Sequence, residues 1–153
     1  MTTSVLQVLD RKGHHVETVP EETPVDEIAR LLSTRHIGGV PVTDRAGTLQ
    51  GLVSERTLVT VLTRQEADFG HLLARDVMMR NVPVAALDDD IAIVARRMTD
   101  CRTRHVPVLE GGAIVGLVSI GDLVKFRLDE AAARITSLQH YITSDEAPGS
   151  RAT

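Results

Sequence analysis

The sequence predicts an α+β fold made of two copies of one β-α-β-β-α unit. The first observation behind this prediction is a hydrophobic run around a proline that occurs twice, as Val40-Pro41-Val42 and Val106-Pro107-Val108. The second is that each run is followed by a polar, glycine-containing turn, by a Gly-Leu-Val-Ser segment and then by a helical pattern. An internal repeat determines the architecture that local signals complete, so every other prediction starts from it.

A constant shift along the chain brings the two copies into register. It aligns Val25 with Ile91 and, after the loss of one residue in the turn, it aligns Gly51 with Gly116. Agreement at many further positions with a single gap is improbable by chance. We therefore interpret the two units as a true internal repeat.

Local signals predict each element of the first unit in order. Residues 16–19 alternate and are rich in β-branched side chains, which is typical of a strand. A helix is expected to have Thr23 as its N-cap and Pro24 as its first residue, and to end at Gly38-Gly39. The other predicted elements are strands at 40–43 and 49–53, joined by a turn at 44–47, and a helix at 55–63.

The second unit repeats this order, and the chain then continues as a helix. The composition of residues 144–153 is typical of a frayed tail. The predicted elements are strands at 82–85, 106–109 and 114–118, a helix at 91–100 that begins after three aspartates, and a last helix from Gly121 toward Tyr141. The expected boundaries are a leader at 1–12, a first repeat at 13–64, a linker at 65–75, a second repeat at 76–127, and a C-terminal helix with a disordered tail at 128–153.

Composition excludes several classes of protein. The chain has 153 residues, of which 42% are hydrophobic and only 2% aromatic, and its formal net charge of -4 gives no electrostatic footprint for nucleic acid. The first residues lack the apolar core of a signal peptide, and no window is apolar enough for a transmembrane helix, so we expect a cytoplasmic protein that does not associate with membranes. The single Cys101 allows no internal disulfide, and the six histidines lack metal-ligand spacing, so no metal site is predicted.

The paired units resemble a tandem of cystathionine-β-synthase (CBS) domains, known as a Bateman module. The resemblance covers roughly Val16 to Lys125, and the whole chain resembles a stand-alone bacterial protein with two CBS domains. It implies two small sheets packed about a pseudo-twofold axis, with two clefts between the repeats that bind adenosine-containing ligands. It also implies a Gly-x-x-[Ser/Thr]-x-x-Asp element in which the aspartate accepts hydrogen bonds from both ribose hydroxyls.

The second repeat keeps this element complete, with Asp122 as the aspartate. A carboxylate at a helix start can accept a vicinal diol, and its charge suits the helix dipole. Glycines on the opposite wall leave room for adenine, and a basic pair before the second proline strand stands where family members often direct basic groups toward phosphate. The residues predicted for this cleft are Thr18, Thr23, Gly38, Gly39, Arg104, His105, Ser119, Ile120, Gly121 and Asp122.

The first repeat departs from the pattern, because Thr57 stands where the aspartate should be. A hydroxyl cannot replace a carboxylate that accepts from two ribose hydroxyls, so we expect this second cleft to bind more weakly or to be used differently. Its predicted residues are Ser54, Arg56, Thr57, Val84 and Asp89.

Each of these residues also has a structural interpretation. Asp122 could be an ordinary helix cap, and Ser54 and Ser119 could simply bond the backbone at the end of a strand. Arg104 could be a solvated cation at a helix end, and the three aspartates at 88–90 could be helix-start acids rather than a magnesium site.

The sequence therefore predicts a regulatory module without catalytic activity. It would bind an adenine nucleotide such as AMP, ADP, ATP or NAD, or a related adenosyl compound, and would need no catalytic cofactor. A homodimer is expected, with a packing face at 131–141, and an unidentified protein would be regulated. One alternative is a ligand-independent interaction scaffold; another is a nucleotide-processing enzyme, although no P-loop, nucleophile-base pair or metal cluster supports it.

Overall fold

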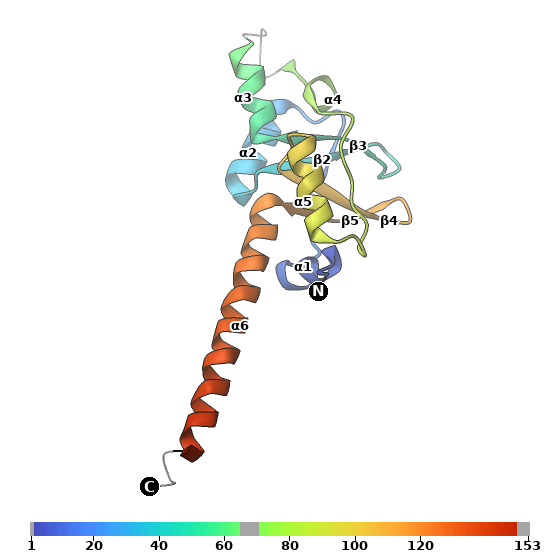
Figure 1. Ribbon diagram of the computed structural model, residues 1–153. Coiled ribbons are helices and arrows are strands. Elements are labelled where there is room, and N and C mark those ends of the chain that lie inside the picture. The colour runs from blue at the N-terminus through green and yellow to red at the C-terminus, as the bar shows by residue number, and fades with distance from the viewer. Residues whose placement is uncertain (1, 65–70, 150–153) are drawn as a thin grey trace.

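The two Pro-Val strands lie in two small sheets, one in each repeat. The structure is a computed structural model that describes residues 2–64 and 71–149 (Figure 1). It confirms the predicted α+β class. The first sheet has the order β1-β2-β3, with β1 parallel to β2 and β2 antiparallel to β3. The second sheet is the antiparallel pair β4-β5. The strands are β1 (Val19–Pro20), β2 (Gly39–Thr43), β3 (Leu49–Ser54), β4 (His105–Glu110) and β5 (Ala113–Ser119).

Helices bury their apolar faces against these sheets and form two separate cores. Val25, Ile28 and Leu32 of α2 are buried, and Ile91, Val94 and Met98 are buried at the same positions of α5. This spacing is that of an amphipathic helix with one face on a sheet. The helices are α1 (Val5–Lys12), α2 (Val25–Arg35), α3 (Glu55–Thr63), α4 (Ala74–Val77), α5 (Ile91–Asp100) and α6 (Ile120–Gly149).

The segment before each repeat packs on the other repeat. Helix α1 precedes the first repeat, but its Val5, Val8 and Leu9 belong to the core of the second. The chain around α4 precedes the second repeat, but Ala74 and Met78 belong to the core of the first. The two repeats are therefore joined by a reciprocal exchange of segments, and neither core is complete without the chain that leads into its partner.

The Gly-Leu-Val-Ser glycines make room for this exchange. A Cβ atom on Gly116 would lie 2.7 Å from Leu9 Cδ1, and one on Gly51 would lie 2.6 Å from Met78 Sδ and 2.7 Å from the Met79 carbonyl oxygen. Real Cβ atoms do not make such close contacts, so any larger residue at either position would force its neighbours to shift. Gly51 and Gly116 occupy the same place in the two repeats.

The structure corrects several details of the sequence-based elements. Of the strand predicted at 16–19, only Val19 lies in a strand, β1. Residues 82–85 were predicted as a strand, but only Ala85 pairs, through an isolated parallel bridge to Val108. Helix α2 begins at Val25 with Pro24 as its N-cap, instead of starting one residue earlier after Thr23. It also ends before the predicted glycines, because His36 takes the left-handed conformation with φ of 54° and its N–H donates to the Leu32 carbonyl.

Helix α6 extends beyond the body that the two repeats form (Figure 1). It leaves β5 beside α1 and α5, and its C-terminal half projects away from the other elements (Figure 1). It continues to Gly149, past Ser144, where the sequence suggested a frayed tail. Residues 150–153 of that tail and 65–70 of the predicted linker lie outside the described part of the chain.

Candidate functional site

The starts of α3 and α6 are built in the same way. Ser54 caps α3: its hydroxyl accepts the Thr57 N–H at 3.2 Å, and its own N–H donates to Thr57 Oγ1 at 3.1 Å. Ser119 caps α6: its hydroxyl accepts the Asp122 N–H at 3.1 Å, and its N–H donates to Asp122 Oδ2 at 2.8 Å. Both are capping boxes, which satisfy orphan backbone donors at a helix start. The structural interpretation of Ser54 and Ser119 is therefore realised, whereas Asp122 takes part in the cap as the third residue of α6 instead of as its N-cap.

The two helix starts differ in what lies in front of them. At the start of α6, the Lys12 ammonium donates to Asp122 Oδ2 at 2.5 Å and to the Leu117 carbonyl at 2.6 Å. Lys12 thereby covers the carboxylate that the sequence assigns to ribose. Among the described residues, Asp122 makes its side-chain hydrogen bonds through Oδ2. Any ligand that used Asp122 would have to displace or share this lysine.

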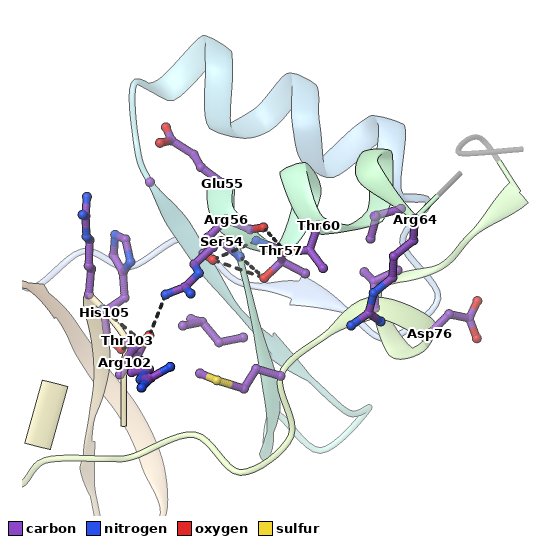
Figure 2. Close-up of a pocket in the computed structure, with 16 residues that line it drawn as sticks. Ser54, Glu55, Arg56, Thr57, Thr60, Arg64, Asp76, Arg102, Thr103 and His105 are labelled. Atoms are coloured by element: carbon purple, nitrogen blue, oxygen red, sulfur yellow. Dashed lines mark hydrogen bonds between the residues drawn. The ribbon is translucent and has the colours of Figure 1, made fainter. Parts of the chain in front are cut away.

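At the start of α3, by contrast, an open cleft of about 770 Å³ lies between the repeats. Ser54, Arg56 and Thr57 line it from the first repeat, and Arg102, Thr103, Arg104 and His105 line it from the second. Figure 2 shows Arg56 reaching from the start of α3 toward Arg102, whose carbonyl accepts its N–H at 3.4 Å. A volume of this size lies within the range of small-molecule sites in proteins.

The lining of this cleft is predominantly basic. Arg56, Arg64, Arg102 and Arg104 face only two acids of the lining, Glu55 and Asp76. None of the four arginines forms an ion pair with another described residue. Arginine presents several donors in a rigid planar fork that matches phosphate and carboxylate oxygens. The cleft is therefore suited to an anionic ligand.

His105 stands at the junction of the two repeats. Its imidazole packs on the Gly38-Gly39 backbone, because a Cβ atom on Gly38 would lie 2.9 Å from His105 Nε2. Burial lowers the pKa of His105 below its ordinary value, and the Lys12 ammonium lowers it further, while the Asp122 and Glu55 carboxylates oppose this. A neutral ring therefore covers the two glycines that the sequence assigned to adenine.

A sequence model of the CBS domain family matches residues 2–64 and 74–129. The chain belongs to the CBS domain family. Over 104 residues it is 32% identical to the CBS domain-containing protein CBSCBSPB2 of Arabidopsis thaliana, a match that covers 67% of this chain and 19% of that protein. The chain thus spans about a fifth of the length of this plant relative.

Solved CBS structures share the fold. The CBS-domain containing protein ATU1752 from Agrobacterium tumefaciens is similar with a TM-score of 0.78 at 38% identity, covering 83% of this chain and 95% of that one. The CBS domain pair of protein MJ0100, solved in complex with 5′-methylthioadenosine and S-adenosyl-L-methionine, is similar with a TM-score of 0.73 at 24% identity. That similarity covers 81% of this chain and 98% of the MJ0100 chain.

The open cleft beside α3 is lined by residues from both predicted sets. Gly38, Arg104 and His105 come from the set assigned to the Asp122 cleft, and Ser54, Arg56 and Thr57 from the weaker set. Of the rest, Gly39 lies under the His105 ring, and Ile120 donates its N–H to the Arg104 carbonyl at 2.8 Å. The residues outside the lining of the cleft are Thr18, Thr23, Gly39, Val84, Asp89, Ser119, Ile120, Gly121 and Asp122.

Val84 and Asp89 are held together by Arg97 instead of facing the cleft. One Arg97 nitrogen donates to the Val84 carbonyl at 2.9 Å and to Asp89 Oδ2 at 2.8 Å. The hydrogen bond from the Ala86 N–H holds the pKa of Asp89 below its ordinary value, and the Arg97 guanidinium acts in the same direction. Asp89 therefore stabilises the turn before α5.

Sequence reasoning missed Lys12, Arg64 and Arg102. The repeat alignment could have pointed to Arg102, because it is equivalent to His36, the residue that ends α2. The two residues share a left-handed backbone, with φ of 53° at Arg102. Lys12 gave no signal, since only the packing of α1 on the other repeat brings it to Asp122. Among the described residues, no helix is long and apolar enough to cross a membrane, and no cluster of His, Cys, Asp or Glu is arranged to hold a metal ion.

Proposed function

We propose that this CBS-domain chain is a regulatory module that binds an adenosine-containing phosphate compound in the open cleft beside α3, without catalysing a reaction. The observation that carries the proposal is the cleft of about 770 Å³ with four arginines among its lining residues. The complex of the MJ0100 domain pair with two adenosine derivatives supports the adenosyl part of the ligand. AMP, ADP, ATP and NAD all carry the phosphate that the arginines would recognise.

Ligand binding in this place would act on the contact between the repeats. Arg56 belongs to the first repeat, and Arg102 and Arg104 belong to the second. A phosphate that contacted both sides would draw the repeats together. We propose that the resulting change of shape is the regulatory signal. A homodimer of the chain would transmit this signal to a partner protein. Because the ligand would bind the folded chain and not the unfolded chain, its binding would also stabilise the fold.

The test is isothermal titration of the purified protein with AMP, ADP, ATP, NAD and S-adenosylmethionine. We expect at least one of the phosphate compounds to bind, and Arg104→Gln to weaken it by roughly 10-fold or more, as the loss of a charge-assisted hydrogen bond requires. The matched control is Arg96→Gln, which removes the same charge from the exposed side of α5 and should leave affinity unchanged. No binding by any of the five, or equal effects of the two variants, would overturn this assignment.

Asp122 remains a second candidate location for the same function. A ribose bound there would compete with Lys12, so Lys12→Gln should strengthen binding and Asp122→Asn should abolish it. If the ligand occupies the cleft beside α3, neither variant should change its affinity by more than about 2-fold, because neither residue lines that cleft. Incubation of the protein with ATP, followed by measurement of the remaining ATP, distinguishes a regulatory module with either binding site from an enzyme. A regulatory module leaves ATP intact.

A further inference from the structure

Helix α6 carries a continuous heptad pattern of apolar side chains. Starting at Val124, they recur at alternating steps of four and three residues, which is the spacing of the a and d positions in a coiled coil. These seam residues are Val124, Leu128, Ala131, Ile135, Leu138 and Ile142. The pattern contains no break between the part of α6 that lies on the second repeat and the part that projects beyond it.

Most of the seam lies on a side of α6 that the body leaves exposed. Only its first residues, Val124 and Leu128, border the body, where they line an apolar groove with Ala92 of α5. Leu123 and Phe126 are buried in the second core, and Glu130 accepts a hydrogen bond from Thr3 Oγ1 at 3.4 Å. At 3.6 residues per turn, this body-facing side lies roughly 130° around the helix from the seam. Leu128 is 64% exposed and Leu138 is 62% exposed. The body therefore packs against one side of α6 and leaves the seam exposed to solvent from residue 131 to residue 142.

A helix of this kind requires a partner. All residues from 131 to 142 are exposed, so no packing within the described chain supports the projecting half of α6. Isolated helices of similar length are marginal in water, and their stability in proteins comes mainly from packing of an apolar face. An apolar strip that continues over several turns is the surface that another strip of the same pattern buries best.

We infer that the seam of α6 pairs with the seam of a second copy of this chain in a parallel, two-stranded coiled coil. Ile135 and Ile142 occupy a positions and Leu138 occupies a d position, a combination that favours two parallel strands. The flanking residues are compatible with this orientation. In a parallel pair Arg134 faces Gln139 of the second copy, whereas an antiparallel pair with aligned seams would place Arg134 against Arg134.

This inference does not depend on ligand binding and is tested on the full chain by sedimentation equilibrium without nucleotide. The wild-type protein should be a dimer. The variant with both Ile135→Lys and Leu138→Lys should raise the dimer dissociation constant by more than about 1,000-fold, because four apolar side chains per dimer lose their burial. The matched control carries Thr136→Lys and Ser137→Lys, adds the same charge to the same turn on the other side, and should remain dimeric.

Orientation is tested by disulfide cross-linking. In a background with Cys101→Ser, Leu138→Cys places one thiol per chain at a d position, where parallel strands bring the two copies within bonding distance. Efficient formation of a covalent dimer is expected. A monomeric wild type, a dimer that survives the seam substitutions, a higher oligomer, or the absence of cross-linking at 138 would each overturn the inference. Circular dichroism of all variants shows whether the body remains folded.

Discussion

The starts of α3 and α6 hold equivalent places in the two repeats, yet one faces an open cleft and the other is closed. Both begin with a serine cap, and they differ three residues later, where Thr57 in the first repeat corresponds to Asp122 in the second. The carboxylate attracts Lys12 from α1, and the lysine fills the space in front of α6. The threonine carries no charge, and within the described ranges neither Thr57 nor the arginines around the cleft form an ion pair.

The edges of the two sheets show the same difference. In the first repeat the Leu52 backbone exchanges two hydrogen bonds of 2.9 Å with Met79. In the second, the equivalent Leu117 carbonyl receives the Lys12 ammonium instead of a backbone N–H. Lys12 thus replaces a strand contact with a side-chain contact. The repeats are alike in topology and unlike in electrostatics, which allows them to serve different purposes within one fold.

The largest difference in stability between the repeats is expected from substitutions at Gly51 and Gly116, the two glycines against which the exchanged segments pack. Gly51→Ala should destabilise the protein by about 2–4 kcal/mol, because its Cβ would meet the Met79 carbonyl, which is backbone and cannot turn aside. Gly116→Ala should cost less, about 1–3 kcal/mol, because its Cβ meets only the Leu9 side chain, which can change rotamer. Urea unfolding measures both free energies.

A control for this pair is Gly121→Ala in the first turn of α6. The nearest atom to its Cβ would be Ser119 Oγ at 3.6 Å, an ordinary contact. We expect a gain of about 0.5–1 kcal/mol, since alanine loses less conformational entropy than glycine in a helix. Equal losses at Gly51 and Gly116 would show that the distinction between backbone and side-chain obstruction does not matter here.

A smaller effect is expected where the two capping boxes differ. Asp122→Ala should cost about 1–2 kcal/mol, because it removes the acceptor for the Ser119 N–H, a negative charge at the helix N-terminus and the partner of Lys12. Thr57→Ala should change the free energy of unfolding by less than about 0.5 kcal/mol, because the better helix propensity of alanine offsets the lost hydrogen bond.

Thermal and urea unfolding at low and high salt separate the contributions to this difference. High salt should reduce the cost of Asp122→Ala, since the Lys12 contact is only partly buried. It should leave Thr57→Ala unchanged. A cost for Asp122→Ala that equals that of Thr57→Ala at every salt concentration would mean that the ion pair with Lys12 contributes nothing.

Local sequence signals predicted the elements well and the contacts between distant segments poorly. The helices at 55–63 and 91–100 were predicted with the bounds that α3 and α5 have, because caps and an apolar period act within the segment. The strand at 82–85 failed, since pairing depends on a distant partner and only Ala85 reaches one. The position of Lys12 beside Asp122 was out of reach for the same reason, because α1 is too short for its pattern to reveal which repeat it covers.

The smallest expected effect on the free energy of unfolding concerns the imidazole ring of His105, which packs on the Gly38-Gly39 backbone. His105 has a lowered pKa, caused first by burial and then by Lys12, so between its folded pKa and its unfolded value near 6.5 the unfolded chain binds a proton that the folded chain rejects. Its contribution to stability is complete above that unfolded value and is lost as pH falls through the folded pKa. The groups around the ring are Lys12, Asp122, Glu55 and Arg104.

Consequently, the stability advantage of the wild type over His105→Gln should be largest near pH 7.5 and should shrink as the pH falls toward 5. Urea unfolding at a series of pH values measures it, and His140→Gln on the exposed part of α6 is the control for the loss of a histidine. A constant difference for His105→Gln would mean that the His105 ring titrates alike in both states. A difference that narrows only in that variant would establish that the folded state, in which the His105 ring packs on Gly38-Gly39, disfavours protonation of the ring.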